Sequence, residues 1–204
     1  FLWLGCRQQT YYTYVIPKSQ AGTWWGNADS RLRRSVRRGQ KAGISVRSVN
    51  DAAAIDDCYR LSMMPYTSRG SRPLISSERF EALAGQVLNE QCGRIWLACT
   101  ADGNPVSAAL VLEDWRSAYF VFNGTDSNAE TGTNSALISH IVDDALARGL
   151  DFDFEGSVIQ SIEGYYRLFG PQLRPYSRIW RPSIVNYAKH KAITMAKILG
   201  GYAR

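Results

Sequence analysis

Histidine is scarce in this sequence, since the 204 residues contain only His140 and His190. Two imidazoles that lie far apart in the chain argue against a zinc site and against a Ser-His-Asp triad. The four cysteines show no CxxC spacing and stand in apolar contexts, which predicts reduced core thiols of a cytoplasmic protein. We therefore expect neither a metal centre nor a disulfide framework.

Long hydrophobic runs are also missing. No apolar stretch approaches the roughly 20 residues that a membrane-spanning helix needs. The opening segment Phe1–Leu4 is too short for a secretion signal and lacks a basic flank. The sequence has no initiating methionine, so we expect it to be a piece of a longer protein. What is present is ordinary for a globular protein with a real core, with 45% apolar and 21% charged residues.

Positive charge is concentrated in one segment. Between Asp29 and Arg47, seven Lys and Arg side chains stand against one acidic side chain, and this excess equals the whole net charge of +6. The rest of the chain is neutral in sum. Such a concentration indicates a local anionic partner, such as a phosphate, rather than a protein that coats nucleic acid. The alternative interpretation is a solvated helix face.

The hydrophobic pattern predicts a mixture of helices and strands. Apolar spacing and capping residues predict helices at about 23–42, 51–64, 77–89 and 134–148, another that carries Tyr166, and a basic amphipathic helix near the C-terminus. Alternating β-branched and aromatic residues predict strands at about 8–16, 44–49, 94–100, 105–113, 117–122, 151–155 and 173–180. Strands joined by turns pair antiparallel, whereas the strand-helix-strand unit from Ser117 to Glu155 should be parallel. The expected fold is α/β (α+β), with a mixed, mostly antiparallel sheet and helices on both faces.

The strand from Asp151 to Glu155 has an unusual pattern. Because side chains alternate along a strand, Phe152 and Phe154 share one face while Asp151, Asp153 and Glu155 share the other. A strand does not normally bury three carboxylates. That face is therefore either solvated or part of a polar cleft in which a carboxylate has a chemical role.

Several segments of the sequence resemble the GNAT N-acyltransferase superfamily, and in particular its Fem-like branch, whose members carry two GNAT domains in tandem. The matching segments are Leu32–Gly39 with Gly43–Val46, Ala118–Asp126, Asp153–Ser157 and the Tyr-x-x-x-Gly spacing of Tyr166 and Gly170. The resemblance implies that residues 1–19 end a preceding GNAT domain, that residues 20–182 form a GNAT acyltransferase domain in contact with it, and that residues 183–204 form the C-terminal helix.

The resemblance also implies an activity. GNAT proteins transfer an acyl group from a thioester such as acetyl-CoA, and peptidoglycan-building members transfer one from aminoacyl-tRNA, in both cases to an amino group. Glu155 is the candidate general base, with Asp153 second, and Tyr166 matches the position whose phenol protonates the leaving group. The alternatives are that Glu155 only holds the turn at Gly156 and that Tyr166 only packs against Phe169.

The donor's pyrophosphate is expected at the N-terminus of the helix near Asn134, where free N–H groups and the helix dipole favour an anion. The residues concerned are Gly132, Thr133, Asn134 and Ser135. The loop departs from the family pattern, Arg/Gln-x-x-Gly-x-Gly/Ala, because Glu130–Asn134 contains one glycine and no basic residue.

The acceptor is expected to be a small or phosphate-bearing amine. Its phosphates would be held by Arg34, Arg37, Arg38, Arg69 and Arg72, through bidentate guanidinium contacts. Two other functions stay open. One is transfer from aminoacyl-tRNA to a cell-wall precursor, in which the same arginines would contact the tRNA or a nucleotide-sugar diphosphate. The other is a non-catalytic GNAT domain used for interaction.

Overall fold

A computed structural model describes residues 3, 5–68, 70–157 and 159–181 of the chain. These residues form two compact units, Thr13–Arg174 and a smaller one made from Phe1–Tyr12 and Pro175–Arg204. The C-terminal helix predicted at 183–204 lies outside the described residues, and so does Arg69, which was predicted to bind the acceptor's phosphates.

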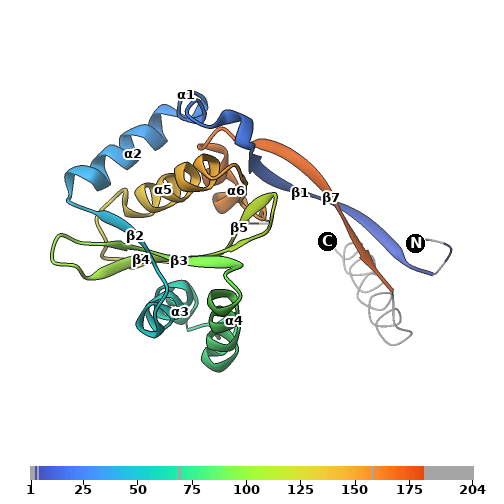
Figure 1. The fold of residues 1–204 in the computed structure, drawn as a ribbon, viewed down its shortest axis with the longest axis horizontal. Helices are drawn as coiled ribbons and strands as arrows, with labels where there is room; N and C mark the ends of the chain where they lie inside the picture. Colours follow the sequence, from blue (N-terminus) through green and yellow to red (C-terminus); the bar gives the residue numbers. More distant parts are fainter. Residues whose placement is uncertain (1–2, 4, 69, 158, 182–204) are drawn as a thin grey trace, which may run out of the picture. The chain divides into compact units, whose positions relative to one another are not determined.

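The larger unit is organised by a mixed sheet, as predicted (Figure 1). Its strand order is β2-β3-β4-β5-β6-β1-β7, and every pairing with a recorded register is antiparallel except β5 with β6. The strands are β1 (Arg7–Ile16), β2 (Ser45–Val49), β3 (Gly93–Cys99), β4 (Pro105–Glu113), β5 (Ser117–Thr125), β6 (Asp151–Asp153) and β7 (Gln172–Trp180). The predicted parallel unit is thus confirmed.

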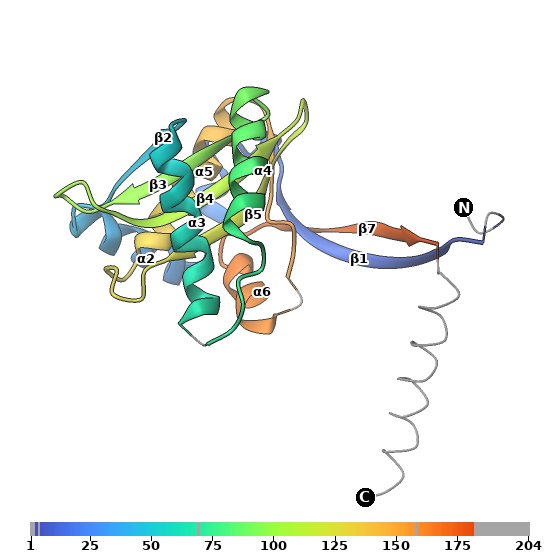
Figure 2. The same cartoon turned by 90° about the horizontal axis from the view of Figure 1, so that it is seen from below.

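Helices cover both faces of this sheet, and each face has its own hydrophobic core (Figures 1 and 2). On one face lie α3 (Ala52–Thr67) and α4 (Ser77–Asn89), which pack Cys58, Leu61 and Phe80 against β3 and β4. On the other lie α2 (Ser30–Lys41) and α5 (Thr133–Ala147). The remaining described helices are α1 (Trp24–Asn27), α6 (Gln160–Arg167) and the 3-10 turn η2 (Lys18–Gln20).

The helix predicted at 23–42 is two helices in the structure. Asp29 separates α1 from α2 and caps α2, because its carboxylate accepts the N–H of Arg31 at 2.7 Å. Its own N–H donates to the Leu168 carbonyl, which lies just beyond α6. A residue that bonds outside the helix cannot continue it. The cap was predicted, but the break was missed.

Helix α3 runs one turn beyond its predicted end because it tolerates Pro65 in its last turn. Proline has no N–H, so the carbonyl four residues earlier, that of Leu61, loses its helical donor. Gly124 of β5 packs on this carbonyl so closely that a Cβ atom there would lie 2.0 Å from the Leu61 oxygen. The proline and the glycine together bring α3 against β5.

Two glycines set the crossing of α2 and α5. A Cβ atom on Gly39 would lie 2.8 Å from the Gly132 carbonyl oxygen, and one on Gly132 would lie 2.1 Å from the Ser35 carbonyl oxygen. Gly132 also has a φ of 101°, in the region that side-chain-bearing residues rarely adopt. The N-terminus of α5 is therefore packed directly on the backbone of α2.

The described part of the smaller unit consists of the outer halves of β1 and β7. The Gln8 side chain donates to the Ser177 hydroxyl at 2.8 Å, and the rings of Tyr11 and Tyr176 lie 5.8 Å apart.

No helix among the described residues is long and apolar enough to span a membrane. All four cysteines are free, and Cys58 and Cys99 are buried as expected, whereas Cys92 is exposed.

The glycine crossing predicts opposite effects for one substitution made in two helices. Gly39→Ala should lower the free energy of unfolding, because the added methyl group meets the backbone of α5. Gly85→Ala, in α4, should raise it by about 0.5–1 kcal/mol, because the methyl group meets nothing within 4 Å and alanine favours the helix. Urea denaturation of both variants measures this, and a stabilised Gly39→Ala protein would contradict the close crossing.

Candidate active site

A cavity of about 240 Å³ opens where β5 and β6 stop pairing. The two strands pair only along Ser117–Tyr119 of β5 and Asp151–Asp153 of β6, although β5 continues to Thr125. The cavity is lined from α3, the 68–76 loop, β5, α5 and α6 by Ser62, Met63, Tyr66, Leu74, Phe120, Val121, Phe122, Asn123, Asn134, Ile162, Tyr165 and Tyr166. Most of its wall is thus apolar or aromatic, with a few polar side chains, as is usual for ligand sites.

Tyr166, in α6, lines this cavity. Its ring packs on Phe154 at 4.7 Å and, edge to face, on Phe120 at 6.5 Å, rather than on Phe169. No described group hydrogen-bonds its hydroxyl. Burial raises the pKa of Tyr166 to about 12, so the phenol is protonated at neutral pH and free to donate.

A chain of hydroxyl groups holds the neighbouring Tyr165 in place. The Tyr165 hydroxyl lies 2.9 Å from Ser135 Oγ of α5, which in turn lies 2.9 Å from Ser35 Oγ of α2. Burial raises the pKa of Tyr165 to about 12 as well. These contacts tie α6 to α5 and α2, and so fix the helix that carries Tyr166.

The end of β6 is shaped by Asp153. Its carboxylate accepts a hydrogen bond from the Thr13 hydroxyl of β1 and, at 2.8 Å, one from the N–H of Glu155. Glu155 itself has a φ of 59°, and Gly156 follows with a φ of 69°. The chain therefore turns sharply after Asp153, and the residue that holds this turn is Asp153 rather than Glu155.

Both carboxylates are perturbed. Burial raises the pKa of Asp153 above its usual range, against the lowering effect of the Thr13 hydrogen bond. The Glu155 side chain reaches the surface, yet the protein around it removes part of its hydration and thereby raises its pKa, and the nearby Asp153 charge adds to this. A raised pKa suits a general base that works near neutral pH.

Of the three predicted catalytic residues, only Tyr166 lines the cavity in the described structure. Glu155 follows the strand that borders the opening, because β6 is the parallel neighbour of β5. The predicted functions of Glu155 and Asp153 therefore stay predictions, and the structure assigns Asp153 a turn-holding contact.

The predicted pyrophosphate residues at the start of α5 differ in their surroundings. Gly132 faces α2, and the buried Thr133 and Ser135 use their hydroxyl groups in internal hydrogen bonds. Asn134 alone lines the cavity, with its side-chain oxygen held at 3.0 Å by the Asn123 amide. In the first turn of α5, the Thr133 N–H donates to the Glu130 carbonyl and the Ala136 N–H donates to the Gly132 carbonyl. The N–H groups of Asn134 and Ser135 have no backbone acceptor among the described residues.

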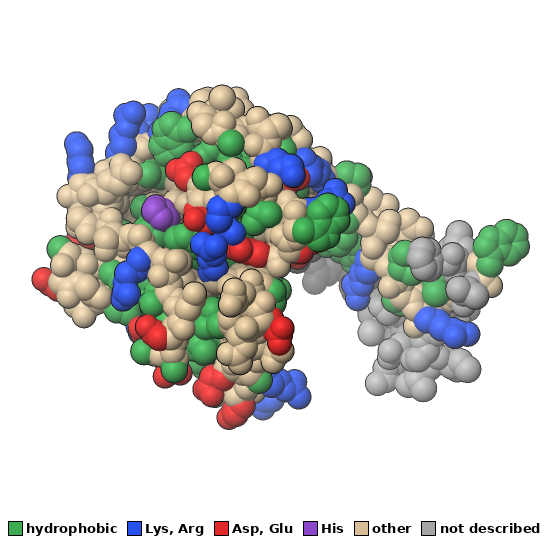
Figure 3. All heavy atoms as spheres, viewed as in Figure 1, with side chains coloured by type: hydrophobic (Ala, Val, Ile, Leu, Met, Phe, Trp, Pro, Cys, Tyr) green, Lys and Arg blue, Asp and Glu red, His purple; other side chains and the backbone are tan. Residues whose placement is uncertain are grey.

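The basic helix α2 also divides into separate environments. Arg33 donates to the Ala28 carbonyl at 2.6 Å and caps the end of α1, and Arg31 pairs with Asp29 at 3.0 Å. Arg34, Arg37 and Arg38 are exposed, and Figure 3 shows Lys and Arg side chains gathered over α2. Arg37 lines a second cavity, between α2 and α5. Arg72 is exposed in the loop that contributes Leu74 to the first cavity.

A β-bulge in β5, beside the cavity, was not predicted from the sequence. The register of β4 and β5 shifts so that Val111 faces Phe120 while Leu110 faces Phe122, which leaves Val121 as the extra residue of a β-bulge. Bulges leave backbone groups unpaired and occur next to active sites. A one-residue insertion leaves no mark on a run of apolar residues, so no sequence signal marks it.

Comparison with known proteins establishes the family. A sequence model of the acetyltransferase (GNAT) domain matches residues 26–165, more than half of the chain. The chain belongs to the GNAT acetyltransferase family. A search of curated proteins finds no match. The family match implies an acyl-CoA donor. Among the described residues, no group of three His, Cys, Asp or Glu side chains is placed to hold a metal ion.

Solved structures show the same fold at low sequence identity. The C-terminal domain of a putative lysylphosphatidylglycerol synthetase from Agrobacterium fabrum is 14% identical, with a TM-score of 0.68 over 97% of this chain and 68% of that one. FemX is 12% identical, with a TM-score of 0.72 over 88% and 67%. L-PGS from Bacillus licheniformis is 12% identical, with a TM-score of 0.61 over 89% and 64%. The chain thus spans about two thirds of each relative, and its resemblance to the Fem-like branch is confirmed in its fold.

The turn after β6 predicts different results for its two carboxylates. Glu155→Gly should raise the free energy of unfolding by about 1 kcal/mol, because glycine adopts a φ of 59° without strain. Asp153→Ala should lower it by about 1–3 kcal/mol, because Thr13 and the Glu155 N–H lose their acceptor.

The comparison should be made across pH. Since the pKa of Glu155 is raised above its ordinary value of 4.5, this residue's contribution to stability is full below pH 4.5 and is lost as pH rises through the raised value. The gain from Glu155→Gly should therefore be larger at pH 8 than at pH 4. Equal melting temperatures of the Asp153→Ala and parent proteins would show that this turn does not depend on Asp153.

Proposed function

We propose that this protein is an N-acyltransferase that moves an acyl group, in the first instance acetyl, from a CoA thioester to an amino group of a small or phosphate-bearing acceptor. The observation that carries the proposal is the cavity at the β5–β6 separation, which is lined by a protonated phenol that no described group hydrogen-bonds. Family membership supplies the reaction class, and the cavity supplies a place for it in this chain.

The open edge of β5 suits a donor that contains amide groups. Beyond Tyr119 no described strand pairs with β5 on its β6 side, and Val121 is the bulged residue opposite β4. An extended ligand arm can add to such an edge through main-chain hydrogen bonds, and a free N–H at the bulge can polarise an acyl carbonyl. The N–H groups of Asn134 and Ser135 would then receive the donor's phosphates.

The proton transfers are assigned to Glu155 and Tyr166. An attacking ammonium group must lose a proton, and Glu155, with its raised pKa, would accept it directly or through a water molecule. As the tetrahedral intermediate collapses and the C–S bond breaks, the Tyr166 hydroxyl would protonate the departing thiolate. No covalent enzyme intermediate is required.

The exposed cations would recognise the acceptor. Arg72 stands in the loop that borders the cavity, and Arg34 and Arg38, on α2, are exposed and form no hydrogen bond or ion pair with another described residue. Guanidinium groups bind phosphates in bidentate geometry, so these residues, with Arg69, would favour a phosphate-bearing amine. That residues 1–19 are the end of a preceding GNAT domain belongs to the same proposal.

A second donor is favoured by one observation. The backbone of α2 covers Gly132 and so narrows the space around the expected pyrophosphate site. The loop before α5 contains no basic residue that could pair with a pyrophosphate. Aminoacyl-tRNA carries its acyl group on a terminal ribose and needs no pyrophosphate site. Transfer from aminoacyl-tRNA to a cell-wall precursor is therefore the alternative reaction for the same cavity.

The donor site is tested by Asn134→Asp. The new carboxylate can still accept the hydrogen bond from Asn123, and a negative charge in the first turn of a helix stabilises it by about 0.3–1 kcal/mol. A phosphate at the same place would be repelled. We expect a melting temperature equal to or above the parent's, with acetyl-CoA affinity reduced about tenfold or more in calorimetric titration.

Ser161→Asp, in the exposed first turn of α6, is the matched control and should leave acetyl-CoA binding unchanged. Unaltered affinity of Asn134→Asp would exclude phosphates from this helix end. If the parent protein gives no heat with acetyl-CoA but accepts aminoacyl-tRNA as donor, the second reaction replaces the first.

The proton transfers are tested by the pH profile of kcat/KM. The parent's acidic limb should have its midpoint above pH 4.5, because the pKa of Glu155 is raised and the base must be ionised. Glu155→Gln should lower kcat by about 10²–10⁴-fold and remove this limb. Tyr166→Phe should lower kcat without moving the profile below pH 11, because the pKa of the phenol is about 12.

The contrary result is equally clear. Normal turnover of Glu155→Gln, with the acidic limb still in place, would remove the general-base assignment. Full activity of Tyr166→Phe would return Tyr166 to a packing function.

A further inference from the structure

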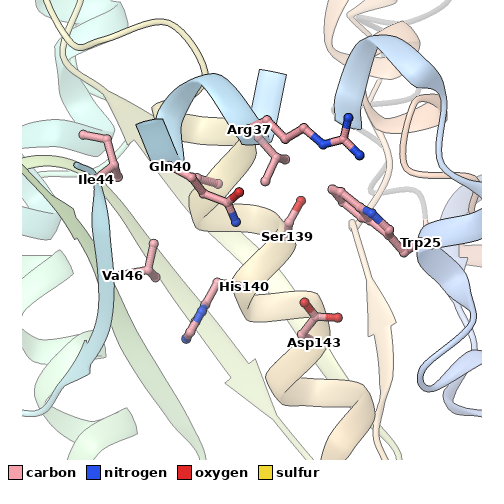
Figure 4. Close-up of a pocket in the computed structure, with 10 residues that line it drawn as sticks. Trp25, Arg37, Gln40, Ile44, Val46, Ser139, His140 and Asp143 are labelled. Carbon is pink, nitrogen blue, oxygen red and sulfur yellow. The ribbon is translucent and has the colours of Figure 1, made fainter. Parts of the chain in front are cut away.

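A second cavity, of about 470 Å³, lies between α2, α5 and β2 (Figure 4). It shares no lining residue with the cavity at β5, because α5 turns Asn134 toward that cavity and Ala136, Ser139, His140 and Asp143 toward this one. The glycine crossing of α2 and α5 lies beside it, since Gly39 is next to the lining residue Gln40 and packs against Ala136. Nothing in the acyl-transfer reaction uses this cavity.

The polar side of the cavity carries one charge of each sign. Figure 4 shows Arg37 on α2 and Ser139 and Asp143 on α5, with the Trp25 indole beside the Arg37 guanidinium. Arg37 and Asp143 are both exposed, so they line the mouth of the cavity. No described group forms a hydrogen bond or ion pair with the Arg37 guanidinium. Asp143 accepts one hydrogen bond, from the Trp24 indole N–H at 2.7 Å, which leaves its second oxygen open.

Ser139 supplies an independent sign of a ligand. It is 4% exposed, and its hydroxyl has no hydrogen-bond partner. A buried hydroxyl without a partner is destabilising, and a helical serine often avoids this by bonding to the carbonyl four residues earlier. A ligand in the cavity that offers a donor or acceptor would satisfy it.

The other side of the cavity is apolar. Val36 of α2, Ile44 and Val46 of β2 and Ala136 of α5 line it, so aliphatic groups meet no polar partner there. Trp25 is half-buried and contributes a flat apolar surface on the polar side. The cavity therefore combines a cation, an anion and an aliphatic wall.

We propose that this cavity binds a free α-amino acid with an aliphatic side chain. A simple anion would meet the Asp143 carboxylate, and a simple cation would meet the Arg37 guanidinium, so neither pairs with both. A zwitterion does: its carboxylate pairs with Arg37, its ammonium group donates to Asp143 and Ser139, and its side chain contacts Val36, Ile44 and Val46. Gln40 and His140 are exposed and line the other edge of the cavity.

The test uses L-leucine as the probe, with the full chain and no acyl donor, so that its outcome does not depend on the proposed reaction. Isothermal titration should show saturable binding of one leucine per chain at millimolar or lower concentration. Two analogues isolate the charges: 4-methylpentanoate lacks the ammonium group, and 3-methylbutylamine lacks the carboxylate. Each should bind about tenfold or more weakly, because hydrogen bonds to charged groups contribute about 1.5–3 kcal/mol.

Variants locate the binding. Arg37→Gln and Asp143→Asn should each weaken leucine about 10- to 100-fold, and the asparagine can still accept the Trp24 hydrogen bond. Arg38→Gln is the matched control, since Arg38 is exposed on the same helix and does not line the cavity. Ser139→Ala should raise the melting temperature of the free protein, because an unsatisfied hydroxyl is removed, and should reduce the further rise that leucine produces.

Three results would overturn the proposal. They are no binding of leucine at 10 mM, equal binding of leucine and both analogues, and the same loss of affinity in Arg38→Gln as in Arg37→Gln.

Discussion

The hydrogen bond from the Glu155 N–H to the Asp153 carboxylate is the interaction on which the candidate active site depends. It turns the chain away from β5 after three paired residues of β6, while Thr13 holds the same carboxylate from β1. Had β6 continued, its backbone would pair with Phe120–Asn123 and close the cavity. Phe154, in the same turn, packs against the ring of Tyr166. One short segment therefore ends the pairing beside the cavity and supports a tyrosine that lines it.

The second constraint is the close crossing of α2 and α5 at Gly39 and Gly132. It places α2 over the start of α5, which leaves Asn134 as the first-turn side chain that faces the β5 cavity. On its other side, the same crossing leaves a space between the two helices, which Arg37 and Ser139 line together with Trp25 and Asp143. One packing contact thus accounts for both the narrow donor site and the separate α2–α5 cavity.

Most of the fold followed from local patterns, and the site followed only in part. Period-two alternation and turn residues predicted the strands and the parallel β5–β6 pair, and the polar caps Asp29 and Asp51 marked two helix starts. The strand predicted at 151–155 was too long, because β6 ends at Asp153 and Glu155 has a φ of 59°. The break at Asp29 was missed because it depends on the distant Leu168 carbonyl. The loop glycine Gly132 was expected to approach a phosphate, but its Cα faces the backbone of α2. Such close approaches join residues far apart in sequence, which periodicity does not register.

The central claim is that acyl transfer takes place in the cavity between β5 and α6. Its most direct test is a crystal structure of the chain with a non-reactive acetyl-CoA analogue, in which a methylene group separates the sulfur from the carbonyl. We predict the analogue along the open edge of β5, with its sulfur within hydrogen-bonding reach of the Tyr166 hydroxyl and its phosphates at the N–H groups of Asn134 and Ser135. An analogue bound in the α2–α5 cavity, or a β5 cavity left empty at saturating concentration, would contradict the account.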